Sequence, residues 1–129
     1  MSCADSIAKL LVAGGFSEVF SKVSPPALVC ADPIVVSEGA FERTSRGDGE
    51  ERGTVTVGVA VVRELCGDAE DIAARCERLV RCCDWETEAD AGDYRIVGVD
   101  TTAPRLDCRD ASGRYIWRFD VEVTAVRSL

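Results

Sequence analysis

The chain has 129 residues, a net charge of −8 and an apolar fraction of 47%. These values are typical of one soluble globular domain, and we predict a single domain spanning residues 1–129. The acidic balance disfavours membrane surfaces and sequence-specific binding to nucleic acid, because both present negative charge. No apolar run approaches the ~20 residues of a membrane span, and the N-terminus lacks the basic start of a signal peptide. We therefore expect a cytoplasmic protein with no membrane partner.

The amino-acid inventory argues against catalysis. The sequence contains no histidine, asparagine or glutamine, which excludes Ser-His-Asp triads, Cys-His pairs and histidine-ligated zinc. The seven cysteines include no C-x-x-C pair, so we interpret them as reduced residues that pack as small apolar side chains. Carboxylate pairs are expected by chance among 23 acidic residues. We predict that the protein is no enzyme and has no cofactor and no metal site.

The N-terminal third predicts little regular structure after its first helix. Residues 3–13 are expected to form a short helix, because Ile7, Leu10 and Leu11 give an apolar stripe and glycines follow. The apolar spacing over 16–23 fits either a second short helix or an irregular connection.

Proline and glycine dominate the next stretch. Two apolar runs, 27–30 and 34–36, flank Asp32-Pro33, so we expect an edge strand or a bent strand there. Residues 42–53, "ERTSRGDGEERG", combine charge and glycine without periodicity, which predicts a long mobile loop. The tripeptide Arg46-Gly47-Asp48 is too short a match to indicate cell adhesion.

The rest of the chain carries stronger periodicity. Alternating valines over 54–62 predict a strand, and the apolar stripe that begins at Ile72 predicts a helix over 67–83 with Asp68 as its cap. Residues 94–102 predict another strand, which an 11-residue connection joins to a last strand over 115–126. Neighbouring strands with such a link usually pair antiparallel. The predicted fold class is α+β, with a mostly antiparallel sheet covered by helices on one face.

The last predicted strand is unusually long. A strand of 12 residues spans about 40 Å, whereas a compact 129-residue domain is roughly 36 Å across. One face is aromatic, with Tyr115, Trp117 and Phe119, and we expect it to anchor the sheet to the helix that carries Ile72. The other face is charged and either is solvated or meets a polar partner. Long strands with exposed edges suit a protein that assembles.

Charged residues on this face and in the two expected loops are the candidates for a subunit or partner interface. They are Arg46, Asp48, Glu50, Glu51, Arg105, Asp107, Arg109, Arg118, Asp120 and Glu122.

The order of elements resembles one known family, the tail terminator, tail completion or minor capsid proteins of long-tailed phages and prophages. The resemblance lies in "GTVTVGVAVV", the helix "DAEDIAARCERLVRCC", "YRIVGVDTTAPRL" and the closing "RDASGRYIWRFDVEVTAV". In the last of these, Asp110, Gly113 and Arg114 occupy the family's D-x-x-G-R turn before an aromatic strand. The segment 24–46 departs from the family pattern and leaves the first sheet edge open.

The resemblance implies a tail-terminator-like α+β subunit without a cofactor or an active site. It implies a homo-oligomeric ring, often a hexamer, that ends polymerisation of the tail-tube protein and offers a surface to the head-completion protein. DNA would pass through its lumen, and the protein would reside in the virion tail or neck after assembly in the host cytoplasm. The alternatives are another head–tail connector or neck protein, a small cytoplasmic enzyme or ligand-binding α+β domain, and a monomeric adaptor.

Overall fold

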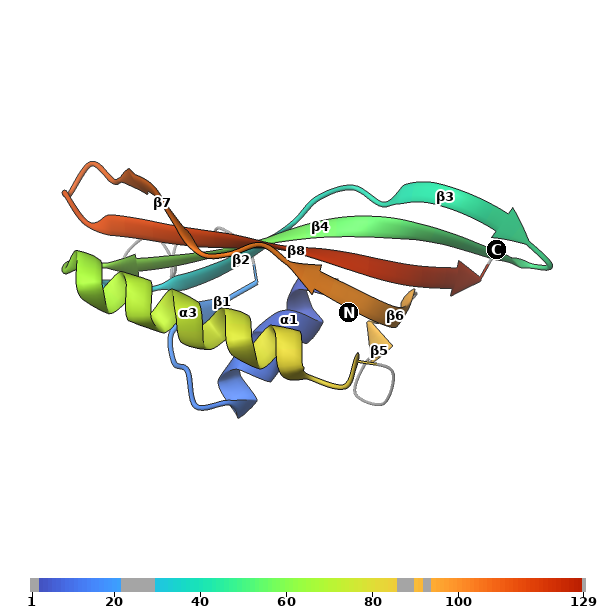
Figure 1. Cartoon of the computed structure of the whole chain (residues 1–129), viewed down its shortest axis with the longest axis horizontal. Helices are drawn as coiled ribbons and strands as arrows, with labels where there is room; N and C mark the ends of the chain where they lie inside the picture. Colours follow the sequence, from blue (N-terminus) through green and yellow to red (C-terminus); the bar gives the residue numbers. More distant parts are fainter. Residues whose placement is uncertain (1–2, 22–29, 86–89, 92–93, 129) are drawn as a thin grey trace.

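The computed structural model describes residues 3–21, 30–85, 90–91 and 94–128. Figure 1 shows an elongated sheet with the described helices lying against one of its faces. The elements follow in the order α1 (Cys3–Ala13), β1 (Val19–Phe20), β2 (Ile34–Glu38), β3 (Glu42–Gly47), β4 (Glu50–Arg63), α3 (Cys66–Cys82), β5 (Asp90–Ala91), β6 (Tyr94–Thr101), β7 (Arg105–Arg109) and β8 (Tyr115–Ser128). This arrangement confirms the predicted α+β class.

The sheet is built around β4 and β8, which we call the central ribbon. These strands pair antiparallel over their full length, from Glu50 opposite Ser128 to Arg63 opposite Tyr115. The outer edge of β4 pairs with β3 at one end and with β2 at the other, and the outer edge of β8 pairs likewise with β6 and β7. Strand β1 adds in parallel to β2, and β5 adds antiparallel to β6.

The hydrophobic core lies between the ribbon and the two helices. Alternate residues of the ribbon face this core, with Val57, Val59 and Val61 from β4 and Phe119 and Val121 from β8 all fully buried. Alternation of this kind is what a half-buried antiparallel strand requires. The helical part of the core includes Ile7 and Leu11 of α1 and Ala73, Cys76 and Val80 of α3.

Both helices predicted from apolar periodicity are present, although the bounds of the second differ slightly from the prediction. Helix α1 coincides with the predicted range 3–13. At its N-terminus, the backbone N–H of Ala4 donates a hydrogen bond to Glu38 Oε1 at 2.9 Å. Helix α3 begins at Cys66, with Leu65 before it, so Asp68 lies in the first turn and is not the cap. None of the helices in the described part of the chain is long and apolar enough to span a membrane.

The predicted loop at 42–53 is wrong, because these residues form β3, a tight turn and the start of β4. The turn consists of Asp48 and Gly49, and Gly49 has φ 74°. Asp-Gly is a strong signal for a two-residue hairpin turn. Apolar alternation is missing because every residue of β3 is exposed.

Two smaller expectations also change. The stretch 16–23 contains the short strand β1 and no helix over its described part, whereas 22–29, with part of the apolar run 27–30, lies outside the described residues. The connection 103–113 contains strand β7, which folds back onto β8. The predicted antiparallel pairing of β6 with β8 is confirmed.

The aromatic face of β8 anchors the sheet through two of its three rings. Phe119 is fully buried, and Trp117 packs against the core and donates its Nε1–H to Cys66 Sγ at 3.3 Å. Tyr115 instead lies under the guanidinium of Arg109, which is 4.7 Å from the ring centroid. The third aromatic residue therefore packs against a side chain of β7.

Candidate assembly surfaces

The central ribbon is longer than the helices that cover it. Each of its strands has 14 residues, which corresponds to a length of about 46 Å. Helix α3 has 17 residues and is therefore only about 25 Å long. Figure 1 shows that the β3–β4 hairpin and the C-terminal end of β8 extend past both helices, while β7 lies at the opposite end of the ribbon. Among the described residues, packing leaves β3 and β7 at these ends exposed.

At the projecting end, a buried carboxylate fastens the hairpin to β8. The side chain of Glu51 is only 6% exposed and forms an ion pair with Arg127, directly opposite it on β8. Arg43 of β3 lies 4.0 Å from the same carboxylate. The guanidinium of Arg127 also stacks 4.2 Å above the ring of Phe41, which packs against the core. The β3 hairpin is therefore held, although β3 itself is solvent-exposed.

Four of the predicted interface residues lie at this end. Arg46, Asp48 and Glu50 are exposed on the hairpin, whereas Glu51 is buried in the ion pair. The structure therefore gives Glu51 an internal partner and leaves the other three facing solvent. Whether they contact another chain stays a prediction.

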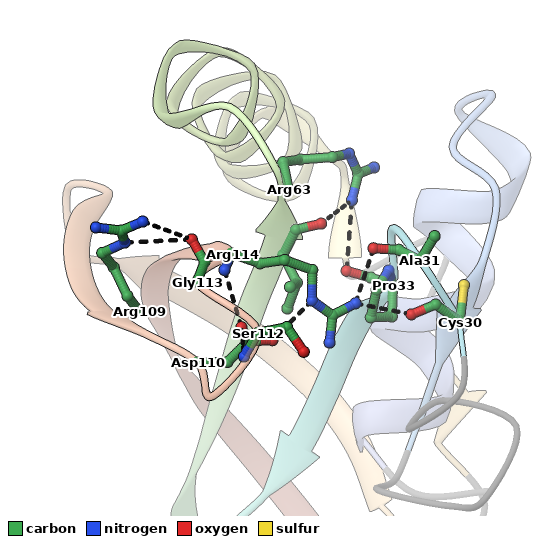
Figure 2. Close-up of polar contacts among 10 residues, drawn as sticks. Cys30, Ala31, Pro33, Arg63, Arg109, Asp110, Ser112, Gly113 and Arg114 are labelled. Carbon is green, nitrogen blue, oxygen red and sulfur yellow. Dashed lines mark hydrogen bonds and ion pairs between the residues drawn. The ribbon is translucent and has the colours of Figure 1, made fainter.

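At the other end, the turn between β7 and β8 is organised by one carboxylate (Figure 2). Asp110 Oδ1 accepts hydrogen bonds from the backbone N–H groups of Ser112, at 3.0 Å, and Arg114, at 2.9 Å. Its Oδ2 pairs with Arg114 Nε at 2.7 Å. Desolvation raises the pKa of Asp110, but these hydrogen bonds and the Arg114 charge outweigh it and hold that pKa below its ordinary value.

Arginine side chains then join this turn to a distant segment. Arg114 Nη1 donates to the carbonyl oxygens of Cys30 and Ala31, both at 2.8 Å, and Arg63 Nη1 donates to the carbonyl of Asp32 at 2.9 Å. Figure 2 shows both guanidinium groups pointing toward residues 30–33, Arg63 from the end of β4 and Arg114 from the turn before β8. We call Asp110, Arg114 and the carbonyls of residues 30–31 the arginine clasp. It fixes the position of the β7 hairpin.

The predicted residues of β7 stay on the outside of this clasp. Arg105, Asp107 and Arg109 are exposed, as is the whole strand. Arg109 donates from Nη2 to the carbonyl of Gly113 at 3.0 Å, in addition to stacking on Tyr115. The β7 edge is thus exposed and firmly supported, as the β3 edge is.

The three remaining predicted residues lie on the helix-free face of β8. Asp120 bridges two arginines, with Arg118 Nε at 3.1 Å and Arg105 Nη2 at 3.2 Å. The guanidinium of Arg118 lies over Gly58 of β4, where a Cβ would collide with it. Glu122 is exposed and stands directly opposite Asp100 of β6. This face is charged as expected, and part of its charge is paired internally.

The sequence reasoning missed the residues that support these surfaces. Arg127 and Arg43 were not candidates, because Glu51 was expected in a solvated loop. Asp110 and Arg114 were noted only as a turn, although the D-x-x-G-R spacing is the local signal that could have pointed to the carboxylate-centred geometry.

The described residues offer little that resembles a reaction centre. They contain no group of three or more side chains arranged to hold a metal ion. Burial raises the pKa of the Cys3 thiol and of the Cys76 thiol to about 12, so both are protonated at neutral pH and unreactive as nucleophiles. One surface groove of about 520 Å³ runs along α1 and β1, lined mainly by alanine and valine with Asp5 and Lys9 at its rim.

Comparisons with known proteins give a structural likeness and no sequence family. No family model and no curated protein matches the chain. A chain in the solved structure entitled "Virion of native gene transfer agent (GTA) particle" matches with a TM-score of 0.63 and 14% sequence identity. The match covers 99% of this chain and 96% of the other. The two chains therefore share the fold over nearly their whole lengths.

Proposed function

We propose that this chain is a structural protein of a phage-like virion and, within the virion, a tail terminator. The observation that carries the proposal is the fold shared end to end with a chain of a gene transfer agent particle. A match that leaves almost no residue of either chain outside it is what two versions of one small subunit would give.

The surfaces of the molecule support an assembling role. A ribbon of two 14-residue strands extends past its helices, and the strands at its two ends, β3 and β7, are exposed along their whole lengths. Exposed edges of this kind are a liability for a protein that remains alone, since they invite pairing with other chains. They are useful in a subunit whose neighbours cover them.

The finer assignment rests on the resemblance of the closing D-x-x-G-R turn and aromatic strand to tail terminators. In this role the protein forms a ring of identical subunits, which we propose to be a hexamer, at the end of the tail tube. The ring stops addition of tail-tube protein and binds the head-completion protein. DNA passes through it without sequence-specific contact, which suits a subunit with a net charge of −8. The protein works in the virion, after assembly in the host cytoplasm, without a cofactor.

Negative-stain microscopy with light scattering tests this role directly. The purified protein should form rings of one defined size, and adding them to polymerising tail-tube protein should shorten the tubes and place a ring at one end. Rings that leave tube length unchanged but bind a head–tail joint would favour a neck protein instead. A strict monomer at millimolar concentration that neither binds nor shortens tubes would refute the assembly role.

A further inference from the structure

The two exposed strands lie on opposite edges of the sheet and at opposite ends of the ribbon. Strand β3 flanks β4 near Glu50, and β7 flanks β8 near Tyr115, whereas Glu50 and Tyr115 stand at opposite ends of the β4–β8 ladder. Among the described strands, each of the two pairs with one neighbour only. Each therefore presents a row of backbone N–H and C=O groups that a further strand could pair with.

Contacts within the subunit hold both edge strands in position. Arg43 joins β3 to Glu51 of β4, and the Glu51–Arg127 ion pair joins β4 to β8 at the same end. The arginine clasp with the Arg109–Tyr115 stack holds β7. A preorganised edge loses little conformational freedom when it binds, so more of the backbone hydrogen bonding remains as affinity. Two fixed, exposed edges distinguish this molecule from one with frayed ends.

We propose that β3 of one copy pairs antiparallel with β7 of the next copy, so that the sheet continues from subunit to subunit. This inference deepens the proposed function and rests on its assembly role. Because the two edges differ, the contact is heterologous, and such head-to-tail contacts close into rings when the rotation between neighbours permits. Every copy in a closed ring has both edges covered.

The charges along the strands favour this pairing. Arg46 of one copy can be placed opposite Asp107 of the next, the residue at which β7 shifts its register against β8. A residue-by-residue antiparallel count then places Asp48, in the turn after β3, opposite Arg105, which also pairs with Asp120 of its own chain. It also places Ser45 opposite Cys108, and it brings no two like charges together over this stretch. Opposite charges facing each other across two strands stabilise the pair, and like charges destabilise it.

Full antiparallel overlap of either strand with its own copy is less favourable than this register. If two β7 strands overlap fully and antiparallel, Asp107 faces Asp107 and each Arg105 faces Arg109. If two β3 strands do so, Arg43 faces Arg46 twice. The fully overlapped symmetric contacts thus bring like charges together, whereas the β3–β7 contact in the register that places Arg46 opposite Asp107 does not.

Disulfide cross-linking between copies tests the proposed register directly. In the proposed register, a cysteine at position 45 of one copy lies opposite the native, exposed Cys108 of the next, at a separation that a disulfide can span. Diamide, which accepts two electrons and two protons from a thiol pair, should therefore convert Ser45→Cys protein into a ladder of linked copies. The matched control, Ser45→Cys with Cys108→Ser, keeps the exposed Cys82 and should give no ladder.

Charge-reversal variants test the same contact through assembly, without a covalent bond. Arg46→Glu and Asp107→Arg should each raise the concentration needed for half-assembly about fivefold or more, since one attractive pair per contact becomes repulsive. A mixture of the two variants, and the double variant, should assemble like the wild type. Arg78→Glu on the exposed surface of α3 makes the same charge change as Arg46→Glu and should have no effect. Thermal melting of each variant, unchanged from the wild type, confirms that the subunit still folds.

The outcomes separate this inference from the proposed function. A ladder that needs both position 45 and Cys108, with assembly restored by the mixture, supports the β3–β7 contact. Rings that persist in Arg46→Glu and Asp107→Arg, with no linked product from Ser45→Cys, overturn it and leave the assembly role standing. A wild-type chain that is monomeric at every concentration overturns both.

Discussion

The edge strands at the two ends of the central ribbon are held in place by different kinds of contact. Each end carries an exposed edge strand that must keep its position without a helix above it. At the β3 end the support is a buried carboxylate, Glu51, paired across the sheet with Arg127 on the core-facing side. At the β7 end the support is the arginine clasp, in which Arg114 reaches main-chain carbonyls 83 and 84 positions away.

This difference has a consequence for how each end fails. The β3 support is made within adjacent strands of the sheet, and a disturbance there should loosen the β3–β4 hairpin from β8. The β7 support ties the turn before β8 to a connection near the N-terminus, so a disturbance there should loosen both segments together. Each prediction below is therefore expected to act mainly at one end.

The largest effect is expected from Gly53→Ala at the β3 end. A Cβ at Gly53 would lie 2.9 Å from the carbonyl carbon of Glu42 and 2.6 Å from Phe41 Cζ, so it meets the backbone of β3 itself. We expect a loss of about 3 kcal/mol in the free energy of unfolding, as for overpacked cores, measured by urea denaturation.

Gly58→Ala is the matched control for this prediction. A Cβ at Gly58 would meet the guanidinium of Arg118 and the hydroxyl of Ser37, both at the ends of side chains that can turn away. We expect a change below about 1 kcal/mol. Equal losses in the two variants would show that the close contact of β3 with Gly53 does not matter.

Arg127→Leu should give the next largest effect. It leaves Glu51, 5% exposed, without its main partner and removes the stack on Phe41. Breaking a buried pair costs about 3–5 kcal/mol, but Arg127 is 39% exposed and Arg43 is near, so we expect about 2 kcal/mol. Adding Glu51→Leu should recover part of the loss, because it removes the unpaired buried charge. A double variant less stable than Arg127→Leu would contradict this explanation.

Arg114→Met tests the other end. It removes the hydrogen bonds to the carbonyls of Cys30 and Ala31 and the ion pair with Asp110, and we expect a loss of about 1–2 kcal/mol. Amide hydrogen exchange should speed up in β7 and near residue 31 and stay unchanged in β3. Arg109→Met, which loses only the bonds to Gly113 and the stack on Tyr115, should have a smaller effect.

The sequence predicted the parts of the fold that bury one face of a regular element. The alternating valines of 54–62, the helical stripe that begins at Ile72 and the alternation of 115–126 all record one-sided burial, and all three elements are present. Residues 42–47 are exposed on both faces, so β3 left no periodicity to read. Its only local signal was the Asp48-Gly49 turn.

The candidate surfaces were predictable as a set of charges but not as an arrangement. Exposed charges such as Arg46 and Asp107 follow from polar stretches between apolar ones. The burial of Glu51 follows from the register that places Arg127 opposite it, and register is a property of two strands together. The contact between Arg114 and residues 30–31 joins positions so far apart that no local pattern encodes it.

The smallest effect expected is a pH dependence confined to the β7 end. The folded pKa of Asp110 lies below its ordinary value of 3.8, because hydrogen bonds from Arg114 and Ser112 outweigh desolvation. A carboxylate whose pKa is lowered on folding adds stability above its unfolded pKa, and that contribution is lost as the pH falls through the folded pKa. Asp110→Asn lacks this titration. The stability difference between the wild type and Asp110→Asn should therefore be constant above about pH 5 and shrink below about pH 4.

Urea denaturation of both proteins at a series of pH values measures this difference. Comparison with the variant cancels the titration of the other carboxylates, which the two proteins share. Asp107→Asn, three residues away on the exposed β7 strand, is the matched control, because Asp107 forms no ion pair within the described residues. A stability difference for Asp110→Asn that stays the same at every pH would mean that the turn carboxylate does not hold the β7 end. The support would then rest on the carbonyl contacts of Arg114 and on the stack of Arg109 over Tyr115.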